Sequence, residues 1–293
     1  MKKNYHTHTY RCGHASGSEE DMVVQAIASG LDTIGISCHS PLPYFRLFMI
    51  RSFGYVRSIF AAKFLTKWIV ADGFGSRLPY RTKNEHLQII KELKEKYKDQ
   101  MTIYAGFEAE WFVQYANYFQ SLLDNKEVDY LILGLHYDRY NCMDRYYLRI
   151  SDDASLVRYG QNACYAMDTG LFSYFCHPDL FMSTKAEFNE TCQKITRDIC
   201  HSALKNNVPL EVNAGGFRRG LKQIGDHERY PYPHDEFWKI VSELEVPVVL
   251  GLDAHAPEQL CKEEYDQLEA YAKRLNLKVI DTFEFKKGTT KSV

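Results

Sequence analysis

The sequence lacks the patterns that mark membrane-spanning and secreted proteins. It has no uninterrupted run of about 18 apolar residues, so a membrane-spanning helix is not expected. Its first residues are charged and polar, without the apolar core of a signal peptide. The formal net charge is only −2, so bulk electrostatics favour neither nucleic acid nor a membrane surface as a partner. We therefore expect a cytoplasmic protein.

Paired cysteine motifs are also missing. The chain has eight cysteines, and none of them forms a C-x-x-C pair. This spacing argues against structural zinc of the four-cysteine kind. Several cysteines, such as Cys176, lie in apolar stretches, and no secretory signal precedes them. We therefore expect reduced and mostly buried thiols.

Predicted strands alternate with predicted helices along most of the chain. This alternation favours a mostly parallel sheet with crossover helices. Buried parallel strands read as continuous apolar runs, as residues 130–133 do. The predicted strands are 5–9, 33–37, 102–107, 129–135, 172–176, 210–213, 246–252 and 277–281, and the predicted helices are 18–29, 84–98, 190–205 and 258–275.

One segment, residues 44–83, breaks this alternation and is too long for an ordinary connection. It carries Lys and Arg throughout but only Asp72 as an acid, and it includes apolar residues such as Trp68. We interpret it as an inserted basic loop and helix within a single domain of residues 1–293. Three roles stay open: a helix packed on the body, a lid that brings positive charge to an anionic substrate, or a surface for membrane docking or oligomerisation.

Potential metal ligands occur at the ends of at least six predicted strands. Alternate residues of a strand share one face, so His6 and His8 can reach the same metal, as can Asp253 and His255. Imidazole and carboxylate ligands suit Zn, Mn or Fe. The candidate ligands are His6, His8, His14, His39, Glu108, His136, His177, Asp253 and His255.

These positions also decide how the sheet closes. In an open, doubly wound sheet the outermost strands would hold their ligands too far from a shared centre. In a barrel, the carboxyl ends of all strands surround one mouth. The sequence therefore predicts an α/β barrel with a multinuclear metal site at its C-terminal mouth.

The motifs that carry these residues resemble the polymerase-and-histidinol-phosphatase (PHP) family, and within it the histidinol-phosphate phosphatase branch. The resemblance runs from about Lys3 to Glu258. It implies a distorted TIM-like (β/α)7 barrel with a trinuclear centre of two or three divalent metals. In chain order, the motifs are His6-Thr7-His8, Cys12-Gly13-His14, Ser37-Cys38-His39, Gly106-Phe107-Glu108, His136, Cys176-His177-Pro178 and Asp253-Ala254-His255.

The resemblance also implies how the ligands are divided among the metals. His6, His8, Glu108 and Asp253 would hold the first metal. Glu108 would bridge to a second metal, completed by His136 and His177, and His14, His39 and His255 would hold a third. Glu108, Asp253 and His255 are taken as the catalytic residues.

Two positions depart from the family pattern. Cys38 stands where the branch often has Asp, and we interpret it as a small buried thiol rather than a ligand. Residues 211–218 resemble a family motif in which an Arg follows an Asn and a Gly, although the small residues between them differ. Arg218 is therefore predicted to hold a substrate phosphate oxygen through its planar donors, with a surface ion pair as the alternative.

These features predict hydrolysis of a small phosphate monoester, in which a hydroxide activated by the metals attacks the phosphorus. L-Histidinol phosphate, an intermediate of histidine biosynthesis, is the expected substrate. A phosphodiesterase or exonuclease acting on nucleotides is the alternative enzyme, and a non-catalytic metal-sensing module is the alternative from another class. We expect no nucleic-acid or membrane partner, and the sequence leaves the oligomeric state open.

Overall fold

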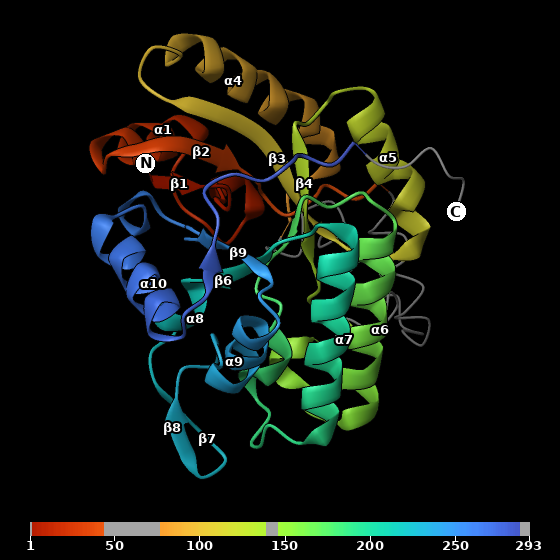
Figure 1. Cartoon of the computed structure of the whole chain (residues 1–293). Helices are drawn as coiled ribbons and strands as arrows, with labels where there is room; N and C mark the ends of the chain where they lie inside the picture. The colour runs from red at the N-terminus through yellow and green to blue at the C-terminus, as the bar shows by residue number, and fades with distance from the viewer. Residues whose placement is uncertain (1, 44–76, 139–145, 288–293) are drawn as a thin grey trace, which may run out of the picture.

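A single sheet of eight parallel strands organises the protein in a computed structural model that describes residues 2–43, 77–138 and 146–287 (Figure 1). The strand order follows the chain, as expected for successive strand–helix–strand units. In this order the strands are β1 (Lys2–Asn4), β2 (Leu31–Ile36), β3 (Thr102–Glu110), β4 (Tyr130–Gly134), β5 (Tyr174–Phe175), β6 (Leu210–Asn213), β9 (Pro247–Gly251) and β10 (Lys278–Val279).

The row of strands curls until its two ends meet at the carboxyl side. An isolated parallel bridge between Thr7 and Ala254 joins the continuation of β1 to the continuation of β9. The His8 amide donates to the Ala254 carbonyl at 2.8 Å. Seven strands thus run from β1 to β9, and the two-residue β10 adds an eighth at the edge of β9. The predicted TIM-like α/β fold is confirmed.

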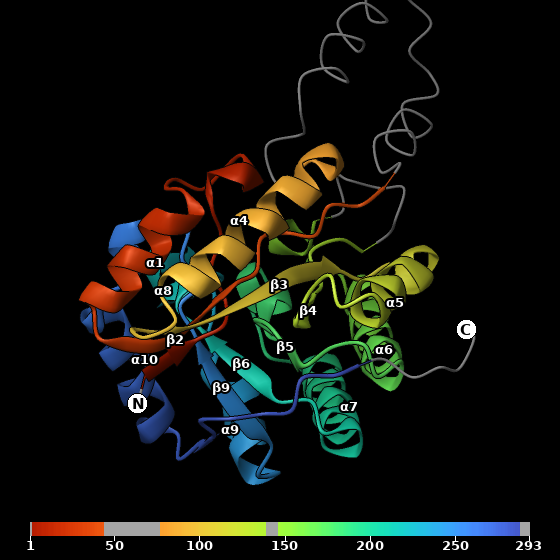
Figure 2. The same cartoon turned by 90° about the horizontal axis from the view of Figure 1, so that it is seen from above.

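Helices surround this sheet, as the view from above shows (Figure 2). The pair α6 and α7 lies side by side on the face of β5 and β6, and α10 packs beside β9. A two-stranded hairpin, β7 (Lys222–Ile224) and β8 (His227–Arg229), projects from the body. The helices are α1 (Glu19–Ala28), α4 (Lys83–Lys96), α5 (Ala116–Asp124), α6 (Asp153–Asp168), α7 (Glu190–Asn206), α8 (Gly215–Arg218), α9 (Asp235–Glu243) and α10 (Lys262–Arg274).

Several predicted strand boundaries are wrong: β2, β5 and β10 differ from their predicted ranges, and the differences at β1 and β3 bear on the site. The strand predicted at 5–9 is instead β1 at Lys2–Asn4, because the following backbone divides its hydrogen bonds between Ser37 on one side and Ala254 on the other. Strand β3 continues to Glu110, because it stays paired with β4 beyond the predicted end. Glu108 therefore lies inside a strand instead of just after one.

Helix predictions were right in position and incomplete in number. The Ser18 side chain accepts from the Asp21 amide, and Asp21 accepts from the Ser18 amide, so the predicted start of α1 is confirmed. The helix predicted at 258–275 is divided into a short 3-10 turn at Pro257–Gln259 and α10. Helices α5, α6, α8 and α9 were not predicted, nor was the hairpin.

Most of the basic segment 44–83 lies outside the described residues, so its three proposed roles stay untested. Its described end contains Arg77, which pairs with Glu110 of β3 at 2.7 Å. Helix α4 then begins at Lys83. Among the described residues, no helix combines the length and the apolar character needed to cross a membrane.

The base of the barrel, at the amino ends of the strands, is filled by aromatic rings. Tyr130 is fully buried, and its hydroxyl donates to the Tyr5 carbonyl at 2.6 Å. A Cβ on Gly35 or Gly106 would lie within 3 Å of Tyr130 ring atoms, so these glycines make room for the ring. Phe285 stacks on Tyr130 with centroids 5.0 Å apart. We call this cluster the aromatic base; its members are Tyr5, Tyr104, Tyr130, Tyr174, Phe283 and Phe285.

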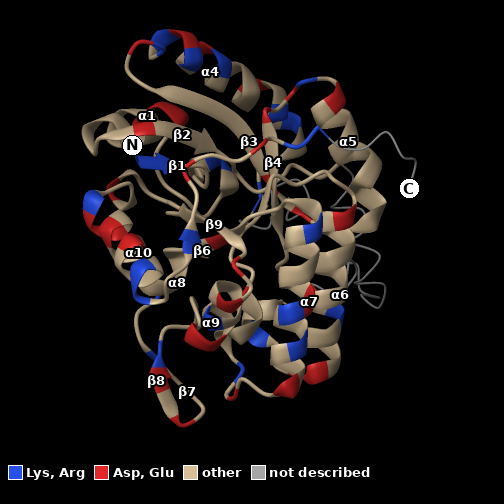
Figure 3. Cartoon of the chain, in the orientation of Figure 1, with Lys and Arg blue, Asp and Glu red and all other residues tan. Residues whose placement is uncertain are grey.

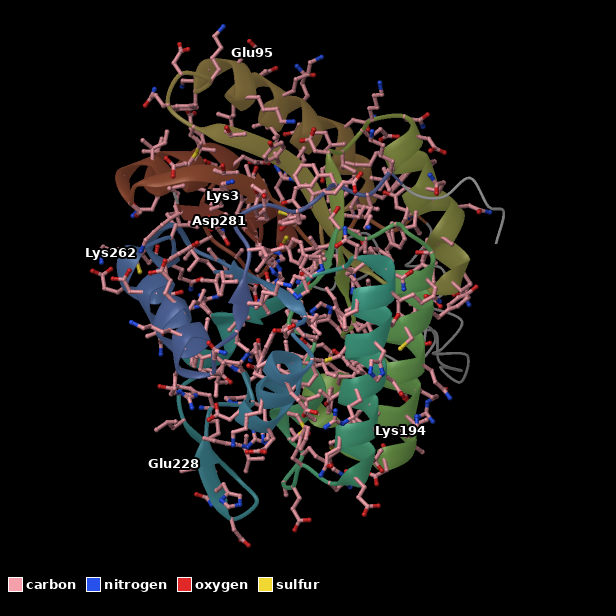
Figure 4. All side chains as sticks on the ribbon, in the orientation of Figure 1. Lys3, Glu95, Lys194, Glu228, Lys262 and Asp281 are labelled. Atoms are coloured by element: carbon pink, nitrogen blue, oxygen red, sulfur yellow. The ribbon has the colours of Figure 1, made fainter. Side chains whose placement is uncertain are left out.

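Charged side chains cover the outer helices, and the strands are largely uncharged (Figure 3). Glu95, Lys194 and Lys262 point away from the body on α4, α7 and α10 (Figure 4). Such solvated charges contribute little to stability. The buried charged groups at the carboxyl ends of the strands are the exception to this pattern.

Candidate metal centre

The first group of candidate ligands meets where β1 and β9 end. The Nε2 atoms of His6 and His8 lie 3.1 Å apart. They are 3.3 and 3.2 Å from Asp253 Oδ1, and 3.5 and 3.4 Å from Glu108 Oε2. Both histidines are fully buried. The predicted geometry, with alternate residues of one extended segment facing the same point, is present.

Glu108 lies between this group and a second one. Its Oε1 atom is 2.9 Å from His177 Nε2 and 3.2 Å from His136 Nε2. Its Oε2 atom is 2.8 Å from His39 Nδ1. Because the two oxygens face different sets of imidazoles, the carboxylate is positioned to bridge two cations, as the resemblance implies.

The third group lies nearer to solvent. The Nε2 atoms of His14 and His255 are 3.0 Å apart. The His255 ring stacks on His8 with centroids 4.1 Å apart, and the His8 and His39 rings are 4.5 Å apart. All nine predicted ligands therefore lie in one continuous cluster. How they divide among individual ions stays a prediction.

Electrostatics keep the two carboxylates ionised. Burial opposes charge on Glu108, but His39 and His136 outweigh it and hold the pKa of the carboxyl well below its usual range. The Asp253 pKa is lowered in the same way, against burial, by the adjacent imidazoles. Burial lowers the pKa of His255 to about 3, so this ring stays neutral. Ionised carboxylates and neutral imidazoles are the forms that bind metal cations.

Buried carboxylates orient two of the ligands from behind. The Nδ1 atom of His6 lies 2.9 Å from Glu211, and that of His136 lies 2.8 Å from Glu110. Such contacts fix the ring and the tautomer that present Nε2 to a metal. Glu110 shares the strand face of Glu108, and from the sequence it could either orient a ligand or form an ion pair. Both roles are present, because Glu110 also pairs with Arg77.

Glycine makes one of these contacts possible. A Cβ on Gly251 would lie 1.8 Å from Glu211 Oε1, so the carboxylate reaches His6 only because Gly251 has no side chain. Glu211 is itself fully buried and also accepts from Asn213 Nδ2 at 2.7 Å. Gly251 lies opposite Asn213 in the β6–β9 pairing, so the approach of the Glu211 side chain to Gly251 belongs to the construction of the centre.

The residues present fit divalent cations. Among the described residues, Asp253 Oδ1, His39 Nδ1 and His177 Nδ1 are buried without a well-oriented hydrogen-bond partner, which is costly for polar atoms. The Nδ1 atoms of His14 and His255 face backbone carbonyls, so in neutral rings both Nε2 atoms, which lie 3.0 Å apart, are acceptors and would repel. Cations between these atoms would satisfy them. The nitrogen and carboxylate donors suit Zn, Mn or Fe.

A pocket of about 540 Å³ opens beside the centre, and both charged and aromatic residues line it. Arg218 is among them, as predicted. Its guanidinium, however, donates to the Leu252 and Asp253 carbonyls and pairs with Glu264. Its prediction as a phosphate ligand is untested. The other lining residues outside the ligand set include Arg77, Tyr137, Tyr146, Arg149, Arg219 and Tyr232.

Sequence reasoning missed several of these groups. Glu211 was recognisable as an acid inside an apolar strand, but no role was assigned to it. Tyr232 lies in a loop that was considered for the mouth, and it does line the pocket. The sequence of the same loop, rich in Pro and Tyr, predicts solvent-exposed histidines. This is confirmed for His227 and wrong for His234, which is buried. Both histidines line a separate cavity of about 830 Å³.

Two cysteines lie against the cluster. Cys38 is fully buried, as predicted, and its sulfur accepts from the Thr9 amide at 3.3 Å. That it is a thiol outside the ligand set stays a prediction. Cys176 lies 3.3 Å from Glu108 Oε1 and also donates to the Leu133 carbonyl at 2.9 Å. A metal-bound thiolate would face this carbonyl without a proton between them, so the contact favours the thiol form.

Comparisons with known proteins agree with this geometry. A family model described as the PHP domain matches residues 4–215. A Deinococcus radiodurans protein named "Probable histidinol-phosphatase" is 23% identical over 266 residues, which cover 87% of this chain and 86% of that protein.

Two solved structures share the fold. HisK of Listeria monocytogenes superposes with a TM-score of 0.67 at 18% identity, covering 90% of this chain and 99% of that one. Histidinol phosphate phosphatase of Lactococcus lactis, solved with zinc, L-histidinol and phosphate, gives a TM-score of 0.64 at 16% identity. The match covers 98% of this chain and 97% of that one.

Proposed function

This chain belongs to the PHP domain family, and on that premise we propose that it is a metal-dependent phosphatase that hydrolyses L-histidinol phosphate to L-histidinol and phosphate. The observation that carries the proposal is the cluster of seven histidines and two carboxylates, most of them buried, beside an open pocket. All of them except His14 fall in groups whose ligand atoms lie close enough together to hold a metal ion. The relatives named as histidinol phosphatases support the choice of substrate.

The protein's own groups suit hydrolysis of a phosphate ester. Divalent metals, when bound, supply Lewis acidity and lower the pKa of a coordinated water. His6, His8 and Asp253 would hold one cation, and Glu108 would share a second with His136 and His177. Glu211 and Glu110 keep His6 and His136 oriented before substrate arrives, which lowers the reorganisation needed during reaction.

Surrounding groups would exclude water and retain the substrate. The rings of Tyr137, Tyr146 and Tyr232 form part of the pocket wall, and Tyr146 stacks on His136 with centroids 6.0 Å apart. A fixed aromatic wall favours a small planar group on the alcohol, such as imidazole. No Ser or Cys nucleophile is required in this arrangement.

The test is phosphate release from L-histidinol phosphate by protein loaded with zinc or manganese, with a nucleotide diester as the control. We expect rapid turnover of the monoester, loss of activity after chelation and no diester cleavage. Diester cleavage without monoester turnover would instead favour the nuclease alternative. Failure to hydrolyse either ester, with metals bound, would contradict an enzymatic role.

A further inference from the structure

The cavity of about 830 Å³ lies apart from the metal centre, and none of the nine candidate ligands lines it. Its wall is formed by the β7–β8 hairpin, the start of α9 and the C-terminal half of α10, elements that Figure 1 shows around the base of the hairpin. We call it the hairpin cavity. Its volume is within the range of cavities that hold small molecules in proteins.

Aromatic rings form much of this wall. Phe217 packs edge to face on Tyr230 with centroids 4.9 Å apart, and on Tyr271 with centroids 5.5 Å apart. Phe188 stacks on His234 with centroids 5.4 Å apart. All five residues line the hairpin cavity. Flat rings of this kind favour a ligand that has a planar ring of its own.

His234 brings an unsatisfied polar group to the wall. The residue is 9% exposed, and its Nδ1 atom is buried without a hydrogen-bond partner in the part of the chain that the structure describes. Burial, reinforced by the charge of Arg229, lowers the pKa of the imidazole to about 4, so the ring is neutral at pH 7. A neutral imidazole has one nitrogen that accepts a hydrogen bond. His234 can therefore accept from an N–H group of a ligand.

The charged groups of the wall favour a cation. Arg274 donates to both oxygens of Asp235 at 2.7 Å. Arg229 directs four of its donors at backbone carbonyls. By contrast, Glu187 and Glu228 are exposed and have no ion pair among the described residues, and Glu228 lies on the projecting hairpin (Figure 4). Because both arginines are engaged, the charged groups left to meet a ligand are acidic.

The hairpin cavity and the metal-centre pocket share one segment of chain. Tyr230 and His234 line the hairpin cavity, whereas Tyr232, between them in sequence, lines the pocket beside the metal centre. The His234 amide donates to Asp179 at 2.7 Å, which fixes the end of this segment. A ligand in the hairpin cavity would therefore contact a segment that also forms part of the metal-centre pocket.

We propose that the hairpin cavity is a second binding site, for a small organic cation that carries a planar ring. The aromatic wall holds the ring, His234 accepts a hydrogen bond from the ligand, and Glu187 and Glu228 attract its positive charge. The site does not depend on the proposed phosphatase function.

Three probes of similar shape and different charge test the class of ligand. Metal-loaded protein would be titrated by calorimetry with phenethylammonium, 2-phenylethanol and 3-phenylpropanoate. We expect phenethylammonium to bind with a Kd of about 1 mM or below, as suits a ligand of this size. The neutral alcohol should bind about fivefold more weakly, and the carboxylate more weakly still, because the free charges of the wall are exposed and negative.

Variants of the wall test where the cation binds. Ala270 is exposed on α10 and lines the cavity, so Ala270→Trp fills the space without disturbing the core and should weaken binding by more than about 10-fold. The double variant Glu187→Gln/Glu228→Gln should weaken cation binding about fivefold and leave binding of the alcohol unchanged. Glu263→Gln, also exposed on α10 but outside the cavity, is the matched control and should bind as wild type does.

His234→Phe tests the polar group alone, because it keeps a ring against Phe188 and removes the acceptor. We expect cation binding to fall by about 10-fold, with the melting temperature measured to confirm that the variant is folded. Affinity equal to that of wild type would remove His234 from the site.

Tyr146→Ala separates the two pockets, because Tyr146 lines only the one beside the metal centre. It should bind phenethylammonium as wild type does. Loss of binding in Tyr146→Ala, with Ala270→Trp unaffected, would place the probe beside the metals and overturn the proposal. Equal affinity for cation and alcohol would overturn the class of ligand, and no binding of any probe would overturn the site. None of these measurements uses turnover, so their failure leaves the proposed phosphatase function intact.

Discussion

At the mouth of the barrel, His6 and Asp253 face each other across the ends of β1 and β9, and at its base Tyr5 packs on Phe283 with centroids 4.8 Å apart. Tyr5 and His6 are neighbours in sequence, yet one belongs to the aromatic base and the other to the metal centre. Alternation along an extended segment permits this, because successive side chains face opposite ways.

The two regions differ in how their polar atoms are satisfied. At the base, the Tyr130 hydroxyl has a carbonyl partner and the rings pack edge to face or stacked. At the mouth, Asp253 Oδ1 is buried without a well-oriented hydrogen-bond partner among the described residues, and imidazole nitrogens face one another. The base is complete as protein alone, whereas the mouth needs cations. In this barrel, therefore, stability and chemistry occupy opposite ends of the same strands.

The largest expected effect lies at the mouth. Glu108→Gln keeps the shape of the side chain but removes the charge shared by the surrounding imidazoles. We expect a bridging metal to be lost and kcat/KM to fall by about 1000-fold or more, because a metal supplies several kcal/mol of transition-state stabilisation. Elemental analysis and a phosphate-release assay would measure this. Full metal content with wild-type activity would remove Glu108 from the centre.

A substitution at the base should have the opposite signature. Phe285→Ala removes a ring that stacks on Tyr130 and contacts Tyr104 with centroids 4.8 Å apart. The free energy of unfolding should fall by about 2 kcal/mol, less than for a fully buried ring because Phe285 is partly exposed. Denaturant unfolding would measure it, with Glu284→Ala, exposed in the same segment, as the matched control.

The separation between the aromatic base and the metal centre would be contradicted if Phe285→Ala changed metal content or kcat by more than Glu284→Ala does. Such a result would mean that the base and the mouth are mechanically coupled. Unchanged stability would instead mean that the C-terminal segment contributes nothing to the aromatic base.

The sequence predicted the mouth better than the base. Histidines and acids that follow apolar strands can be recognised as metal ligands, because few structural roles require so many of them. The aromatic base could not be predicted, since Tyr and Phe occur throughout the chain and no spacing relates Tyr5 to Phe283. Contacts between segments at opposite ends of the sequence depend on closure of the barrel, which local patterns do not encode.

The groups that support the ligands were harder to predict than the ligands. Glu110 was considered because it lies two residues from Glu108, on the same strand face. Glu211 contacts His6 across more than two hundred residues, and only Gly251 allows the approach. Arg218 was recognisable from the family motif, but the two carbonyls and the carboxylate that its guanidinium contacts could not be predicted.

Glu211→Gln should have an intermediate effect on metal affinity. It tests whether a residue that orients a ligand, without binding the metal, contributes to the metal centre. The amide keeps the volume but removes the charge that holds His6 Nδ1–H. We expect metal affinity to fall by about 10- to 100-fold, the cost typical of losing a group that orients a metal ligand. Competition with a chelator would measure this affinity, and calorimetric phosphate binding at saturating metal should recover. Wild-type metal affinity would mean that Glu211 only fills space.

The smallest effect on metal affinity is expected at His8. The thiol of Cys12 faces His8 Nδ1, whereas the carboxylate of Glu211 faces His6 Nδ1. Cys12 Sγ lies 3.4 Å from His8 Nδ1, and thiols are weak hydrogen-bonding groups. Cys12→Ala should therefore lower metal affinity by less than about fivefold, below the change expected for Glu211→Gln. The same chelator competition compares the two variants directly. An equal or larger loss in Cys12→Ala would show that the sulfur orients His8 as strongly as the carboxylate orients His6, and the ranking of the two supports would be reversed.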